Sequence, residues 1–249
     1  MTTTRLTLWF ATAYTIVILV HEAAHGLVAR AVGLHATLFH FWVDIDRNNE
    51  VWQRALFGSA GPLSSVLLGV VAWFAYRAAR PPATAVPLLL LAACGVSNFF
   101  GNLMSAAFVG DFSNVSVWLG LPMSVRYALS VSGLLGVASV LFVAGRELRR
   151  WIPADWPRFV AAALGVVVPV AFGTLIIIVI NQPVAIPGFA VARAGEAAVW
   201  VFAVAGIALA TPPFVLTRID GLTLTWLDIA IALMVLAIVR MLVPGVPLP

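Results

Sequence analysis

The segment from Leu6 to Ala31 reads LTLWFATAYTIVILVHEAAHGLVARA, a hydrophobic run long enough to cross a bilayer that carries His21, Glu22 and His25 in its second half. Because residues four apart share one face of a helix, both imidazoles can reach one metal ion, with Glu22 beside them as proton acceptor. Random placement of four histidines and four glutamates in 249 residues would produce this zinc-binding pattern in about one chain in a thousand. The pattern therefore favours hydrolysis at the depth of a membrane.

The composition of the whole chain is typical of a polytopic membrane protein. Apolar residues make up 62% of the chain, charged residues make up 10%, and the mean hydropathy is +1.05. We expect an all-α fold with about seven transmembrane helices, in a cell membrane of prokaryotic type. The predicted spans are Leu6 to Ala31, Ala55 to Tyr76, Val86 to Val109, Val125 to Gly145, Phe159 to Ile180, Ala194 to Leu216 and Leu224 to Val243.

The basic charge balance does not indicate a nucleic-acid partner. The formal charge is +4 and the pI is about 10.2, but all 14 basic residues are arginines scattered at the ends of the spans, where they meet lipid headgroups. The expected partners are the lipid bilayer and a membrane protein substrate, while the sequence leaves the oligomeric state open. Cys94 is the single cysteine, so the chain has no intrachain disulfide, and its apolar neighbours favour a packed helix interior.

The connection after the first span has a pattern of its own. From Phe39 to Asp46, apolar residues stand at positions 39, 41, 43 and 45, and this period of two predicts a short strand or hairpin at the membrane surface. The sequence Asp-Arg-Asn-Asn at 46–49 then supplies turn chemistry. An edge strand can hold an extended peptide by backbone pairing, which makes Phe41 and Val43 candidate substrate contacts. A solvated amphipathic loop without a partner is the alternative.

Two histidines do not complete a catalytic zinc site, which usually has three protein ligands and a fourth position open to water. Asp111 is the favoured third ligand, because a lone carboxylate at the end of an apolar helix needs a partner. An interfacial aspartate at a helix end is the alternative interpretation. The other candidates are His35, His40, Asp44, Asp46 and Glu50, and of these the two histidines are expected to lie at the surface or interface.

The order of these elements resembles the site-2 protease family of intramembrane zinc metalloproteases over roughly the first 115 residues. The HEAAH stretch matches the HExxH helix of that family, and the strand-like stretch after Gly33 resembles its membrane-associated sheet. Ala60-Gly61-Pro62 resembles the Gly-Pro element of its second core helix. The stretch from Asn102-Leu103 to Asp111 resembles its Asn-Leu-x-Pro motif and the Asp-Gly that provides the third ligand.

The chain also departs from the family pattern at several positions. Ser105 stands where the family usually has proline, and Phe112 replaces the usual glycine. Asp111 lies nine residues after Asn102, where eight is typical, and Ser65 stands where asparagine commonly follows the Gly-Pro pair. These differences indicate a divergent branch.

The resemblance implies a zinc ion bound by His21, His25 and Asp111, with Glu22 as the general base that activates water and returns the proton to the leaving amine. It also implies that Asn102 is a polar group near the substrate or the developing oxyanion. Asn98, one helical turn earlier, could share that contact with the substrate. For both asparagines the alternative is an interhelical hydrogen bond, worth about 0.6 kcal/mol in a membrane.

The expected organisation is a catalytic core of three transmembrane helices and a surface strand segment at 1–115, followed by four further helices at 116–249 as scaffold or gate. The glycines of Gly58-Ser-Ala-Gly-Pro62 and of the third span are explained by close helix packing. A zinc endopeptidase that cleaves membrane-embedded or membrane-proximal segments is the main hypothesis. The alternatives are a metal-ion transporter, which would need polar residues along several helices, and a catalytically silent binder, which would need no general base.

Overall fold

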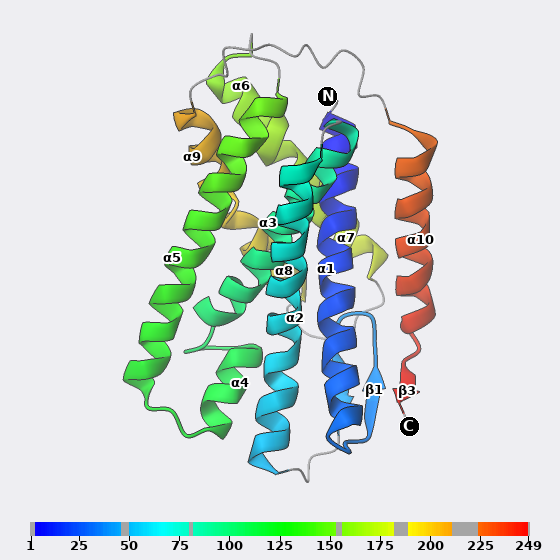
Figure 1. Ribbon diagram of the computed structural model, residues 1–249, viewed down its shortest axis with the longest axis vertical. Coiled ribbons are helices and arrows are strands. Elements are labelled where there is room, and N and C mark those ends of the chain that lie inside the picture. Colours follow the sequence, from blue (N-terminus) through cyan, green and yellow to red (C-terminus); the bar gives the residue numbers. More distant parts are fainter. Residues whose placement is uncertain are drawn as a thin grey trace.

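The structure is a computed structural model, shown in Figure 1, that describes residues 3–45, 50–79, 82–152, 156–181, 189–210 and 224–248. Most of the described chain is helical, and five helical segments are long and apolar enough to cross a membrane. The protein is therefore an all-α, multi-pass membrane protein, as the composition predicts. The segments comprise α1 (Thr3–Ala31), α2 (Val51–Ala78), α3 (Pro82–Met104), α5 (Met123–Leu148) with the 3-10 turn η1 (Arg149–Trp151), and the continuous run of α6 (Arg158–Ala162), the π-helical turn η2 (Ala163–Val167) and α7 (Val168–Ile180).

The predicted count of seven spans is not confirmed, because within the described residues neither of the last two predicted spans is a single helix of spanning length. The span predicted at 194–216 falls on two short helices, α8 (Phe189–Ala198) and α9 (Val201–Leu209), and on residues outside the described ranges. The span predicted at 224–243 is α10 (Trp226–Leu242), whose 17 residues make a helix of about 26 Å, against about 30 Å for the hydrocarbon core. Hydrophobicity alone did not reveal the break between α8 and α9 or the short length of α10.

Helix α1 is the centre of the fold. It packs against α2, α3, α7 and α10, and these neighbours surround it in Figure 1. Its first half packs through the buried side chains of Leu6, Trp9, Phe10 and Val17. The apolar side chains on the outer face of α2 are exposed, as expected for a surface that contacts lipid. They include Leu67, Val71 and Phe74.

Glycines bring the backbones of α2 and α3 into direct contact. A Cβ atom at Gly95 would lie 2.7 Å from the carbonyl oxygen of Ser65 and 2.9 Å from the Cα atom of Gly69. No larger residue fits at Gly95 without moving α2. Close packing therefore explains this glycine, as small residues commonly do between membrane helices.

A small antiparallel sheet lies beside the second half of α1. Its strands are β1 (Ala36–Leu38), β2 (Val43–Ile45) and β3 (Val246–Leu248), in the order β2-β1-β3. The strand predicted from Phe39 to Asp46 is therefore placed differently, because only residues 43–45 of that stretch are in a strand. Phe39 donates its backbone N–H to the carbonyl of Trp42 at 2.9 Å, and the two rings stack 4.5 Å apart. This aromatic turn overrides the alternating pattern, and the predicted turn at 46–49 lies outside the described residues.

Helix α10 is fastened to α1 by a buried ion pair. The Arg5 guanidinium contacts the Asp228 carboxylate at 2.9 Å, and the Trp9 indole N–H donates to the same carboxylate at 2.9 Å. Asp228 also accepts the backbone N–H of Thr225 at 2.8 Å and so caps the start of α10. This contact joins residues more than 200 positions apart and holds α10 where β3, which follows it, can reach β1.

Candidate metal centre

Three metal-ligating side chains meet where α1 approaches the start of the short helix α4 (Asp111–Trp118). The Nε2 atom of His21 lies 3.1 Å from Nε2 of His25 and 2.9 Å from Oδ2 of Asp111. The distance from Nε2 of His25 to Oδ2 of Asp111 is 3.5 Å. Both histidines are buried, and the three side chains form a group that could hold a metal ion.

Hydrogen bonds on the far side of each imidazole leave the converging nitrogens as lone-pair donors. His25 donates Nδ1–H to the carbonyl oxygen of Phe57 at 2.6 Å, because a carbonyl can only accept. Nδ1 of His21 lies 3.0 Å from the amide oxygen of Asn98 and 3.1 Å from the Ser65 hydroxyl. In the neutral form of both rings, the two Nε2 atoms then carry lone pairs that face the Asp111 carboxylate. Three acceptors at this separation repel one another unless a cation lies between them.

The spacing of these three atoms fits a zinc ion. Two ligands at 2.0–2.1 Å from zinc in tetrahedral geometry are about 3.3 Å apart. The three observed separations of 2.9, 3.1 and 3.5 Å scatter around that value. A donor set of two imidazoles and one carboxylate also matches the catalytic zinc sites that keep a fourth position open.

Gly61 leaves room for the two histidines beneath α2. A Cβ atom at Gly61 would lie 2.3 Å from Nε2 of His25 and 2.5 Å from Nε2 of His21. Any side chain at this position would therefore collide with the metal-binding nitrogens. Helix packing alone was expected to explain this glycine. Its contact with the candidate ligand nitrogens is a second steric constraint, at the residue that the resemblance had already singled out in Ala60-Gly61-Pro62.

The start of α4 delivers Asp111 to the site. Gly110 has a φ of +103°, a left-handed conformation that favours glycine, and the chain turns there from the end of α3 into α4. Gly58 allows α4 to approach α2, since a Cβ atom there would lie 2.7 Å from Val115. The Oδ2 atom of Asp111 then lies 2.9 Å from Nε2 of His21 and 3.5 Å from Nε2 of His25.

Glu22 is buried on α1 next to His21, at 8% exposure. Among the described residues, no side chain donates a hydrogen bond to its carboxylate. Glu22 shares a helix face with Gly26, one turn later, and with Tyr14, two turns earlier. A carboxylate that accepts no side-chain hydrogen bond within the described residues, next to a candidate metal-ligand group, can exchange a proton with a water molecule.

The other predicted residues lie at different distances from this centre. Asn98 contacts His21 directly, so the structure places it as an orienting partner of a metal-ligand candidate. Asn102 lies one turn further along α3 and donates its amide N–H to the backbone carbonyl of Asn98 at 3.1 Å. Phe41 lines a pocket with Tyr14, and Val43 packs against the small apolar cluster under the sheet.

None of the alternative third ligands that the structure describes joins the metal-ligand group. His35 and Asp44 are exposed, and Glu50 caps the start of α2. His40 was expected at the surface or interface but is 3% exposed, because its ring faces the end of α7, with Nε2 3.3 Å from the carbonyl of Asn181. Asp46 lies outside the described residues.

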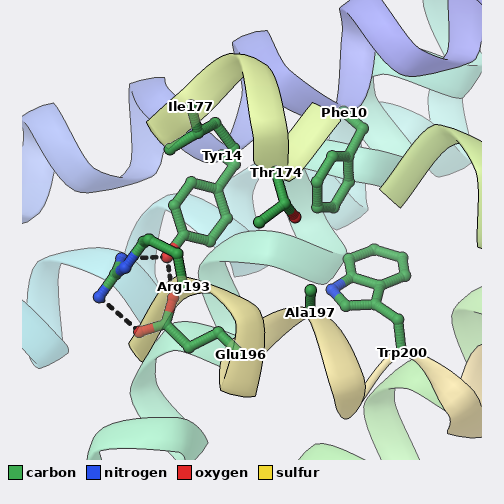
Figure 2. Close-up of a pocket in the computed structure, with 8 residues that line it drawn as sticks. All are labelled: Phe10, Tyr14, Thr174, Ile177, Arg193, Glu196, Ala197 and Trp200. Carbon is green, nitrogen blue, oxygen red and sulfur yellow. Dashed lines mark hydrogen bonds and ion pairs between the residues drawn. The ribbon is translucent and has the colours of Figure 1, made fainter. Parts of the chain in front are cut away.

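A charged cluster from the second half of the chain lies beside α1. Arg193 and Glu196 of α8 form an ion pair at 2.6 Å, and both hydrogen-bond to the hydroxyl of Tyr14. Figure 2 shows these three side chains meeting across a pocket whose other wall holds Phe10 and Trp200. Sequence reasoning took this region as scaffold. The i, i+3 spacing of Arg193 and Glu196 in an apolar stretch was the signal that could have found it.

No family model, no curated protein and no solved structure matches this chain. The likeness to site-2 proteases therefore stays a prediction from the motifs. The metal-ligand group, by contrast, follows from the geometry of His21, His25 and Asp111.

Proposed function

We propose that the protein is an intramembrane zinc metalloprotease of the site-2 protease type, which hydrolyses peptide bonds in membrane-embedded or membrane-proximal segments of other proteins. One observation carries this proposal. Two imidazoles of the membrane-spanning helix α1 and the Asp111 carboxylate at the start of α4 converge within 3.5 Å of one another, with Glu22 next to His21 on α1. A metal ion satisfies these three groups together, and a general base beside it serves hydrolysis.

A zinc ion held by His21, His25 and Asp111 would lower the pKa of a bound water toward neutrality and polarise a peptide carbonyl. The chain's own residues do the rest. Glu22 accepts a proton from the attacking water and returns it to the leaving nitrogen of the cleaved bond.

The neighbours of the two histidines fix their ring orientation. The Phe57 carbonyl, the Ser65 hydroxyl and the Asn98 amide each hold the ring nitrogen that faces away from the site. Such outer partners typically change metal affinity by about 10–100-fold when they are removed. Asn102, one turn beyond, is the proposed polar contact for the substrate carbonyl.

The sheet beside α1 suits the substrate of this reaction. A protease needs its substrate as an extended chain, and an exposed strand edge can pair with such a chain through its backbone. Phe41, just before β2, and Val43, the first residue of β2, are the proposed side-chain contacts. A metal-ion transporter is disfavoured, because His21, His25 and Asp111 converge on one point and do not line a path.

The test uses purified protein in liposomes that contain single-span membrane segments placed between two reporter domains. The unsubstituted protein should contain about one zinc per chain and cleave a subset of these segments. Glu22→Gln should keep the zinc and lose cleavage, because it removes the proton acceptor and preserves side-chain volume. Cleavage that persists in Glu22→Gln would overturn the mechanism. Zinc transport into the liposomes without any cleavage would favour the transporter.

A further inference from the structure

The strand β1 has no free edge in the described part of the chain. On one side it pairs with β2, and on the other with β3 from near the far end of the sequence, which lies beside it in Figure 1. The second pairing aligns Ala36 with Leu248, Thr37 with Pro247 and Leu38 with Val246. The chain thus supplies its own extended segment to the edge of β1.

The segment β3 lies on the face of α1 that carries Glu22. Gly26 follows Glu22 by one helical turn and shares its face. A Cβ atom at Gly26 would lie 2.7 Å from the Cδ1 atom of Leu248, but 3.9 Å from the nearest atom of Leu38 in β1. The Leu248 side chain of the third strand therefore reaches this face beside Leu38 of the first. A side chain of an extended peptide in the position of β3 would reach the same point, one turn of α1 from the proposed general base.

Few contacts hold β3 in this position. It pairs with β1 over three residues, and Leu248 packs against an apolar cluster that includes Ala29, Leu34 and Ala36. Val246 and Pro247 are exposed. Pro247 has no backbone N–H, so the outer side of β3 is poorly suited to accept a further strand. A three-residue strand with one partly buried side chain is the kind of element that opens locally at low free energy.

We propose that β3 is an internal occupant of the strand edge that a substrate peptide takes, so that the substrate must displace Val246–Leu248 before it pairs with β1. This inference rests on the proposed protease function for the identity of the ligand, an extended polypeptide. When no substrate is present, β3 stays paired with β1 and covers its edge. This pairing protects the edge from pairing with the wrong chains.

A reversible lock tests this displacement. Thr37 and Pro247 are directly opposite one another, and Cβ atoms in such pairs are about 4.5–5.5 Å apart, close enough for a disulfide with a small adjustment. Both would be replaced by cysteine in a Cys94→Ala background, which removes the single native thiol. Glu22→Gln is added so that binding is measured without cleavage. The probe is fluorescein-labelled unfolded casein, followed by fluorescence anisotropy.

The oxidised double-cysteine protein should bind casein at least about tenfold more weakly than the same protein after reduction. The reason is that the disulfide lowers the fraction of molecules in which β3 has left β1 and the strand edge can bind a peptide. The single variants Thr37→Cys and Pro247→Cys should not respond to the oxidant. Leu248→Asp, which releases the strand from its apolar cluster, should bind about tenfold more tightly. Equal binding by the locked and reduced proteins, with the disulfide verified by mass spectrometry, would overturn the proposal.

The same variants with Glu22 intact separate this inference from the proposed function. A lock that blocks casein binding in a protein that cleaves no substrate would support the strand edge and count against the protease. Cleavage that proceeds at the same rate in the locked and the reduced protein would count against the strand edge and support the protease.

Discussion

The two halves of the chain use their polar side chains in different ways. In residues 1–115 the side chains of His21, His25 and Asp111 converge on one point. In residues 116–249 polar side chains hold elements against α1, as Asp228 does with Arg5 and as Glu196 does with Tyr14. Convergence indicates chemistry, while pairwise contacts indicate assembly. Substitutions in the first half should therefore change metal binding, and those in the second half should change stability.

Loss of the third ligand should have the largest effect. Asp111→Asn removes the charge that neutralises the metal ion, and we expect zinc affinity to fall by more than about 100-fold, since the loss of an outer partner alone costs 10–100-fold. Competition with a chromogenic chelator measures this directly. Asp44→Asn, which changes an exposed carboxylate in β2, is the matched control and should keep full affinity. Equal zinc affinity in the two variants would exclude Asp111 as a ligand.

A single methyl group at Gly61 should come next. In Gly61→Ala the new Cβ would lie 2.3 Å from Nε2 of His25, so α1 and α2 must separate or the ring must rotate. We expect zinc affinity to fall about 10–100-fold, as for a ligand that has lost its orientation. The control is Gly101→Ala in α3, where a Cβ meets nothing within 4 Å. If Gly61→Ala binds zinc like Gly101→Ala, the steric explanation of the Gly-Pro element is wrong.

Loss of the Arg5–Asp228 ion pair between α1 and α10 should lower stability and leave metal binding unchanged. Asp228→Asn removes the carboxylate charge that contacts the buried guanidinium of Arg5, and breaking a buried ion pair typically costs about 3–5 kcal/mol of unfolding free energy. Unfolding in detergent micelles measures this, with zinc content as a second readout. Arg150→Gln is the control, because Arg150 is exposed and its buried partner Glu147 keeps the hydrogen bond from Tyr76, so the cost should be about 1 kcal/mol or less. Loss of zinc without loss of stability in Asp228→Asn would contradict the division between the two halves.

The same ion pair predicts that the free energy of unfolding depends on pH. Burial would raise the pKa of Asp228, but hydrogen bonds from Thr225, Trp9 and Arg5 outweigh it and lower that pKa below the ordinary value of 3.8. The unfolded state therefore binds the proton more readily than the folded state. The stabilisation is complete above about pH 4 to 5 and is lost as the pH falls through the folded-state pKa. Asp228→Asn should abolish this part of the acid sensitivity.

The candidate metal-ligand group could be predicted from the sequence because each of its members carries a local signal. His21 and His25 are four residues apart on a helix, and Asp111, 90 positions after His21, is a lone carboxylate at the end of an apolar stretch. The contacts of the second half could not be predicted in this way. Asp228 meets Arg5 across 223 positions, and nothing in either neighbourhood specifies the partner. The pairing of β3 with β1 is equally remote, and its three residues carry too little pattern to stand out.

The smallest predicted effect concerns the cluster beside α1. Tyr14→Phe removes one hydroxyl that hydrogen-bonds to both Arg193 and Glu196, and keeps the ring that packs near Phe10. Hydrogen bonds between membrane helices average about 0.6 kcal/mol, so the unfolding free energy should fall by about that amount or twice it. Tyr127→Phe is the matched control, because Tyr127 is half exposed and its ring contact with Phe108 is preserved. Zinc affinity should be unchanged in both variants, since Tyr14 lies two helical turns from Glu22. A drop in zinc affinity in Tyr14→Phe alone would mean that this cluster belongs to the metal centre, and the boundary between the two halves would have to be redrawn.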